Sequence, residues 1–271
     1  GGACANTTNF ADIPLRDEDK WMINRVNDAI EYVNNAMERY DLALAGQRVY
    51  DLIWNEYCDW YIELVKARLW GEDEEDKKVV RFVLVMCLKN MLKLLHPFMP
   101  FITEEIWQAI PHEGEALIVA AWPVYREELS FKAEEAAMES IMSAIRAVRN
   151  RRAEMNVPPS KKCTLYIVTK KPEIFTEGSG FMTRLAYADQ VVICDGDPEG
   201  HEDMLCVVTA DAKLYIPLSQ LIDVEKELAR IAKEKENCLK QIAMFESKLS
   251  NEAFVSRAPE KVVSDQKEKL A

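Results

Sequence analysis

The densest cluster of side chains that could do chemistry is a basic run between residues 146 and 162. Six cations stand there against the single carboxylate of Glu154: Arg146, Arg149, Arg151, Arg152, Lys161 and Lys162. Arginines and lysines gathered in this way are typical of surfaces that contact nucleic-acid phosphates. They are also typical of a solvated helix end, because positive side chains suit the negative end of the helix dipole. The residues alone leave both interpretations open and slightly favour the solvated helix end.

A second cluster lies at residues 20–25, where Trp21 has the basic neighbours Lys20 and Arg25. An aromatic ring with cations beside it can stack on an unpaired base. We predict that Trp21 stacks in this way at an exposed bundle end, while Asn24 and Arg25 supply hydrogen bonds and phosphate contacts one helical turn along. The competing interpretation is that Trp21 covers the end of a helical bundle as a packing residue.

Composition narrows the possible functions. The 271 residues carry a net charge of -12, so the chain is not a uniformly basic nucleic-acid binder, although a local basic patch stays possible. The seven cysteines form no C-x-x-C pair, and the three histidines lie far apart. We therefore expect no metal, no cofactor and no catalytic constellation in this chain. The free cysteines and the lack of an apolar run of eighteen residues predict a cytoplasmic location without a membrane partner.

Hydrophobic periodicity predicts a helical bundle in the first half of the chain. Apolar residues such as Met22, Val26 and Ile30 recur every three or four positions, which indicates one buried helical face. We predict four helices between residue 17 and about residue 110, with a break near Gly46 and ends at Gly71 and Pro97. Short turns between such helices favour antiparallel packing.

The pattern changes after residue 111. A helix is predicted over 131–155 and another over 172–186. Four period-two segments predict strands at 163–169, 190–194, 204–210 and 213–217, of which the last two form a hairpin around residues 210–212. This part is predicted to be a small α+β linking module.

The last region has heptad spacing. Nine seam positions follow one another by threes and fours without a slip: Leu221, Val224, Leu228, Ile231, Lys235, Cys238, Ile242, Phe245 and Leu249. This spacing predicts a coiled coil, with a turn at 250–259 and a returning helix over 260–271. The returning helix is too short to cover the seam. We therefore expect a truncated antiparallel coiled coil in a monomer whose uncovered seam could associate with another copy.

These observations predict a mainly α protein in four segments. Residues 1–16 form an unassigned tail, 17–140 a helical domain, 141–218 the α+β linking module, and 219–271 the coiled-coil arm. Physical reasoning identifies no substrate at this point.

Several motifs resemble a known enzyme family. The segment HPFMPFITEEIWQAIP at 96–111 resembles class I aminoacyl-tRNA synthetases for aliphatic amino acids. The segments DKWMINRVN (19–27) and VYDLIWNEYCDWYIELVK (49–66) resemble the anticodon-binding domain of the valyl-tRNA synthetases. Three later segments resemble the linking region and arm of the same family: AVRNRRAEMNVPPSKK (147–162), KLYIPLSQLIDVEKELARI (213–231) and LSNEAFVSRAPEKVV (249–263).

The resemblance implies a function for each part. That family joins valine to its tRNA with ATP, and its catalytic motifs His-Ile-Gly-His and Lys-Met-Ser-Lys-Ser do not occur in this sequence. We therefore expect a tRNA-binding portion that is inactive by itself, uses no ATP and does not bind DNA. The bundle would read the anticodon loop of valine tRNA, and basic residues of the arm would contact the tRNA body: Arg230, Lys233, Lys240, Lys248 and Arg257.

Two alternatives remain at this point. A bundle joined to a coiled coil could be a scaffold for protein partners. The chain could also be the corresponding region of an isoleucyl or leucyl relative. The lack of C-x-x-C argues against the isoleucyl relative, which often carries a C-terminal zinc module.

Overall fold

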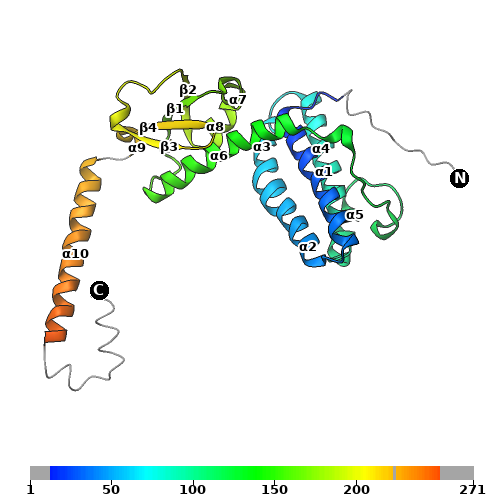
Figure 1. Ribbon diagram of the computed structural model, residues 1–271, viewed down its shortest axis with the longest axis horizontal. Helices are drawn as coiled ribbons and strands as arrows, with labels where there is room; N and C mark the ends of the chain where they lie inside the picture. Colours follow the sequence, from blue (N-terminus) through cyan, green and yellow to red (C-terminus); the bar gives the residue numbers. More distant parts are fainter. Residues whose placement is uncertain (1–12, 222–223, 251–271) are drawn as a thin grey trace.

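The computed structural model describes residues 13–221 and 224–250 (Figure 1). A helical bundle comes first, then a small sheet with its covering helices, and then a long helix that extends away from the sheet (Figure 1). The bundle contains α1 (Asp17–Glu38), α2 (Leu42–Asp51), η2 (Leu52–Tyr61), α3 (Ile62–Leu69), α4 (Glu74–Leu95) and α5 (Pro100–Ala109), followed by the short turns η3 (Leu117–Val119) and η4 (Glu127–Leu129). The mainly α architecture with a small sheet is confirmed.

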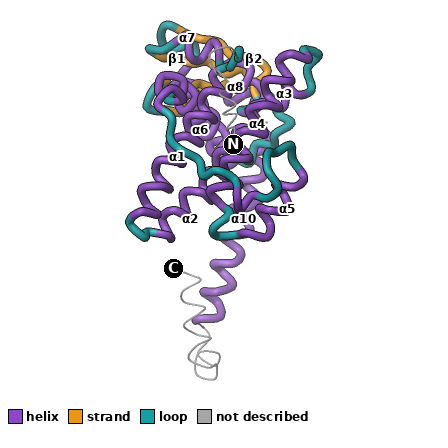
Figure 2. Tube along the Cα trace, turned by 90° about the vertical axis from the view of Figure 1, so that its right-hand side faces the viewer, coloured by secondary structure: helices purple, strands orange, loops and turns teal. Residues whose placement is uncertain are grey.

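The rest of the described chain has both helices and strands. It contains α6 (Lys132–Glu154), β1 (Cys163–Thr169), α7 (Pro172–Glu177), α8 (Ser179–Leu185), β2 (Ala188–Cys194), η5 (His201–Asp203), β3 (Met204–Val208), β4 (Ala212–Pro217), α9 (Leu218–Leu221) and α10 (Val224–Ser250). Figure 2 shows the strands confined to one end of a molecule that is otherwise helical. None of the described helices is long and apolar enough to span a bilayer.

Local signals at the helix starts explain where α1 and α4 begin. The backbone N–H of Arg16 donates to Asp19 Oδ2 at 3.1 Å, half of a capping box. The side chain of Asp73 accepts from the backbone N–H groups of Glu75 and Asp76, which satisfies two donors at the start of α4. Acidic side chains in both first turns also suit the positive end of the helix dipole.

The second helical segment differs from the prediction. Gly46 lies inside α2, so the predicted break there is wrong, and the chain turns instead at Tyr40 and Asp41. A side chain at Gly46 would come within 3.7 Å of the Phe98 ring, so α2 packs against the turn between α4 and α5. A Cβ at this distance would make ordinary van der Waals contact, so the packing does not require glycine at this position.

The helix then widens into a π-helical stretch, η2, before it continues as α3. The N–H of Ile62 donates to the carbonyl of Tyr57, the i to i+5 bond of this geometry. Tyr57, Trp60 and Tyr61 of this stretch are buried. The i, i+3, i+4 spacing of these three residues is that of one helical face, so the sequence predicts their burial but not the wider hydrogen bonds.

The sheet has the order β2-β1-β4-β3. β1 pairs parallel with β2, and α7 and α8 form the connection between them. β4 pairs antiparallel with both β1 and β3. The predicted hairpin at 210–212 is therefore confirmed. The predicted helix over 172–186 is two helices that meet at Gly178, where an added Cβ would lie 2.5 Å from Ile141 Cδ1. Only glycine permits this close approach of α7–α8 to α6.

The helix α6 connects the bundle to the sheet. It packs on α1 and also on α7, α8, β3 and β4, and the buried side chains form one continuous core through both parts. The predicted boundary between residues 140 and 141 lies inside this helix. Figure 1 shows α6 running from the bundle to the sheet without a break.

The helix α10 covers most of the predicted heptad region. Lys235, Cys238 and Ile242 of the seam are exposed. The predicted returning helix at 260–271 lies outside the described residues.

Candidate nucleic-acid interface

Trp21 is fully buried, so the prediction that it stacks on a base at an exposed end is wrong. Its indole Nε1 donates to Glu139 Oε1 of α6 at 3.4 Å. The neighbouring cation Lys20 is paired as well, with Glu134 of the same helix at 3.0 Å. The tryptophan thus fills the contact between α1 and α6, as the competing interpretation held.

The two proposed companions of Trp21 are also engaged inside the protein. Asn24 is buried, and its Oδ1 accepts from the backbone N–H of Phe131 at 3.0 Å. Arg25 pairs with Glu56 at 2.6 Å and with Glu135 at 2.9 Å. Asn24 is enclosed, so its predicted role is wrong. Arg25 is partly exposed, and because two carboxylates already pair with it, a phosphate would have to compete with them.

A buried charge network holds the beginning of the bundle. Arg68 donates to Glu18, Asp19 and Asp76 at 2.8, 2.8 and 2.6 Å, and Tyr61 donates to Asp19 Oδ1 at 2.7 Å. Burial raises the pKa of Glu18, whereas the hydrogen bond from Arg68 lowers the pKa of Asp76. The Nε, Nη1 and Nη2 atoms of Arg68 all donate to carboxylates, so removing this arginine would leave buried carboxylates without their partner.

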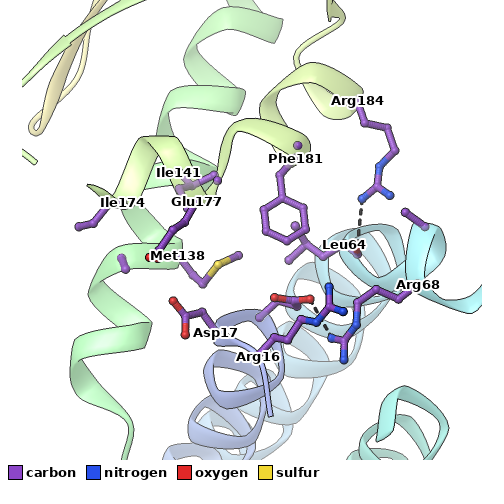
Figure 3. Close-up of a pocket in the computed structure, with 15 residues that line it drawn as sticks. Arg16, Asp17, Leu64, Arg68, Met138, Ile141, Ile174, Glu177, Phe181 and Arg184 are labelled. Carbon is purple, nitrogen blue, oxygen red and sulfur yellow. Dashed lines mark hydrogen bonds and ion pairs between the residues drawn. The ribbon is translucent and has the colours of Figure 1, made fainter. Parts of the chain in front are cut away.

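A cavity of 510 Å³ lies next to this network, between α1, α3, α6 and the α7–α8 pair (Figure 3). Arg184 reaches from α8 to the backbone carbonyls of Glu63 and Leu64 at 2.8 and 2.9 Å. Carboxylates of Asp17 and Glu177 line the same cavity (Figure 3). Because its arginines are bonded and its other charges are negative, the cavity is poorly suited to phosphates and serves as the joint between bundle and sheet.

Two arginines of the basic run are structural. Arg152 is buried and donates to the carbonyls of Pro158 and Lys161 and to Cys163 Sγ. Arg149 donates from Nε to the carbonyl of Leu185 at 2.7 Å. Both guanidinium groups also lie over the Tyr187 ring, at 5.5 and 5.6 Å from its centroid. The predicted phosphate role of Arg152 is wrong because its charge is enclosed by protein.

The other four cations of the run are closer to solvent. Arg146 stacks on the Trp60 ring at 4.9 Å, and Lys161 donates to the carbonyl of Leu221 at 3.0 Å. Arg151 is exposed and pairs with Glu154 at 2.8 Å, and Lys162 is exposed. The exposed side chains of Arg151 and Lys162 are the part of this run best placed to meet a phosphate.

The structure describes two of the five candidate cations of the arm. Lys233 and Lys240 are exposed on α10, and Lys240 pairs with Glu236 at 2.7 Å. The side chains of Arg230 and Lys248, and the whole of Arg257, lie outside the described residues. Contacts of these five residues with RNA stay predictions.

Large apolar side chains are exposed instead at the end of the bundle where α1 turns into α2 and α4 turns into α5. We call residues 38–44 and 96–102 the free end. Both views place α2 and α5 at this end (Figures 1 and 2), and Phe98 joins the two turns by packing near Gly46. Six large side chains of the free end are exposed: Tyr40 88%, Phe101 91%, Leu42, Leu44, Met99 and Ile102.

Tyr40 occupies an unfavourable backbone position. It closes α1 through a Schellman turn, in which Asp41 N donates to the Ala36 carbonyl at 2.9 Å and Tyr40 N to the Met37 carbonyl at 3.0 Å. Its φ is +62°, a left-handed conformation that normally favours glycine. A large, almost fully exposed ring at a strained position points to a function for that ring.

Sequence reasoning missed Tyr40. Its one signal in the sequence is an aromatic residue where glycine or asparagine usually ends a helix. The exposed cation Arg39 lies beside it and pairs loosely with Asp41 at 3.5 Å. The free end therefore offers what the Trp21 cluster does not, an exposed ring with a cation next to it.

Comparison with known proteins identifies two regions of the chain. Residues 19–167 match the family described as the anticodon-binding domain of tRNA ligase, and residues 223–271 match the valyl tRNA synthetase tRNA binding arm. The chain is 44% identical over 93% of its length to the valine–tRNA ligase of Clostridium acetobutylicum and 45% identical over 93% to that of Clostridium perfringens. The corresponding enzyme of Geobacillus stearothermophilus is 43% identical over 93% of the chain.

The chain spans 29% of the length of each of these three relatives. Among the described residues, no group of His, Cys, Asp or Glu could hold a metal ion. The family match covers more than half of the chain, from the first helix of the bundle into β1. The chain therefore belongs to the family of anticodon-binding domains of tRNA ligases.

Proposed function

We propose that this chain is the tRNA-binding part of a valine–tRNA ligase and that the free end of its bundle receives the anticodon loop. The valine–tRNA ligases to which the chain is similar and the two family matches support the proposal. The complete ligase would join valine to its tRNA with ATP in the cytoplasm. The chain alone would bind tRNA without catalysing the reaction and would need no cofactor.

The observation that carries the proposal is the exposed Tyr40 ring, held at positive φ beside Arg39. The bases of an anticodon loop are unpaired and can splay out onto aromatic rings. Phe101, which is 91% exposed, adds a second ring at the same end. The mechanism is thus recognition by stacking, with Arg39 available to a loop phosphate.

Exposed cations elsewhere would add phosphate contacts that do not depend on sequence. Arg151 and Lys162 near the end of α6, and Lys233 and Lys240 on the arm, are the described candidates. They would strengthen binding to any tRNA, whereas the free end would discriminate valine tRNA from the tRNAs of the isoleucyl and leucyl relatives.

The test is tRNA binding by single variants of the free end. Base–aromatic stacking contributes about 1–3 kcal/mol, so Tyr40→Ala should weaken binding of valine tRNA by about 5- to 150-fold. Phe101→Ala should act in the same direction. Trp70→Ala is the matched control, because Trp70 is 79% exposed but lies beside the start of α4, at the opposite end of the bundle.

Three outcomes would contradict the proposal. One is a wild-type chain that fails to bind tRNA, which would favour the scaffold alternative. Another is equal weakening by Tyr40→Ala and Trp70→Ala. The third is that the chain binds valine and isoleucine tRNAs equally and that Tyr40→Ala weakens both by the same factor. This result would contradict the proposed specificity for valine tRNA.

A further inference from the structure

A second cavity of the bundle has a different character from the joint shown in Figure 3. It is a groove of 750 Å³ between α1, α4 and the segment 111–129. Four cations line it, and Glu113 is its only carboxylate: the cations are Arg81, Lys89, Lys93 and Arg126. On a chain with a net charge of -12, a groove with this balance is a local positive surface.

Three of the cations belong to one face of α4. Arg81, Lys89 and Lys93 are separated by eight and four residues, a spacing that places them in one row along a helix. From Arg81 to Lys93 the row spans about 18 Å at 1.5 Å per residue. A row of this length suits an extended polyanion better than a single phosphate.

The cations of the row are incompletely neutralised. Lys89 pairs with Glu113 at 3.1 Å, but the Glu113 side chain is 86% exposed. In the described part of the chain, Arg81 and Lys93 have no ion pair with a carboxylate. Lys93 lies over the Trp107 ring at 5.8 Å. Burial lowers its pKa, the nearby Glu113 carboxylate opposes this shift, and Lys89 adds to it. An anion in the groove would stabilise this ammonium group.

The groove begins next to the free end. Lys93 precedes His96, the first residue of the α4–α5 turn at the free end, by less than one helical turn. The row of cations therefore leads away from the free end along α4. An RNA whose loop lies at the free end has its paired stem directly behind that loop.

We propose that this groove holds the phosphate backbone of one strand of the anticodon stem. The inference rests on the proposed function, because the loop at the free end sets where the stem begins. Arg81 and Lys93 would contact phosphates directly. Glu113 would move toward solvent and release Lys89 for a further contact. Such contacts fix the register of the RNA without reading its sequence.

The experiment measures binding of a 17-nucleotide anticodon stem-loop RNA at several salt concentrations. Each lost phosphate contact lowers the slope of log K against log salt by about 0.7–0.9, so the double variant Arg81→Gln, Lys93→Gln should lower it by about 1.5. The matched control is Lys66→Gln with Lys78→Gln. Both of these lysines pair with a glutamate three residues earlier and lie outside the groove.

Glu113→Gln should strengthen RNA binding, whereas the double variant of Arg81 and Lys93 should weaken it. The Glu113 variant removes the carboxylate that competes with RNA for Lys89, so it should tighten stem-loop binding at least about two-fold. A thermal melt of each variant checks that the bundle stays folded. Because Glu113 is exposed, this variant should not change the melting temperature.

The outcomes separate the two proposals. If the wild-type chain does not bind the stem-loop, both the proposed function and this inference fail. If Tyr40→Ala weakens binding while Arg81→Gln with Lys93→Gln leaves the salt slope at the control value, the free end stands and the groove proposal is overturned. A lowered slope together with tighter binding by Glu113→Gln supports it.

Discussion

The free end of the bundle and the basic run at 146–162 differ in how well their residue types predict what is exposed for binding. The basic run has many cations, yet Arg149 and Arg152 use their guanidinium groups on protein carbonyls and on the Tyr187 ring. The free end has few charges, yet Tyr40 and Phe101 are almost fully exposed. The comparison shows that what a side chain can bind depends on which of its groups remain without protein partners.

Trp21 gives the largest test of this comparison, because it was the residue that sequence reasoning placed at the RNA. Trp21→Ala should destabilise the fold by about 3–5 kcal/mol, since it empties a fully buried site between α1 and α6. Urea denaturation measures this loss. The variant that remains folded should bind tRNA as the wild type does. Weaker binding without a loss of stability would restore the stacking role of Trp21.

The next effect concerns the basic run. Arg152→Met should cost about 2–4 kcal/mol of unfolding free energy, because two carbonyls lose a charged donor inside the protein. Arg151→Met, one position earlier, should change stability by less than about 0.5 kcal/mol, because Arg151 is exposed. The same denaturation curves compare the two variants. Equal stabilities would mean that Arg152 is not structural.

Tyr40→Gly separates stability from binding at the free end. Glycine removes the strain of the left-handed conformation, so the variant should be more stable by about 0.5–1 kcal/mol after the entropy of the unfolded chain is included. It should nevertheless bind valine tRNA about 5- to 150-fold more weakly, because the ring is lost. Thermal melts and binding titrations on one preparation test both parts. A variant that gains stability and keeps its affinity would show that the ring has no role in binding.

The smallest effect is expected from the exposed remainder of the basic run. Arg151→Gln combined with Lys162→Gln should lower the salt slope of tRNA binding by about 1.5, equally for cognate and non-cognate tRNA. Its stability should not change. An unaltered slope would identify both residues as part of a solvated helix end and would leave the free end and the arm as the sites of binding.

Local signals predicted most of the fold. Periodicity and proline positions located α1, α4 and α5, and strand alternation located the β3–β4 hairpin. The exceptions have particular causes. Periodicity does not reveal the i to i+5 bonds of η2, because Tyr57, Trp60 and Tyr61 keep the spacing of an α-helix. A single glycine does not end α2 at Gly46.

The interface was less predictable because distant residues decide it. Trp21 is buried by Glu139 and its helix, 118 residues later in the chain. The groove along α4 exists only because the segment 111–129 folds back beside it. Spacing within one helix shows that Arg81, Lys89 and Lys93 share a face, but it does not show which of them has a carboxylate partner.

The continuous helix α6 fixes the distance and the relative rotation between the bundle and the sheet. Its 23 residues extend for about 34 Å, with the bundle anchored near one end and the sheet near the other. One inserted residue would rotate the far half by about 100° and separate Ile141 from Gly178 or Arg146 from Trp60. A change in the length of α6 would therefore have to be matched in any partner that contacts both the bundle and the sheet.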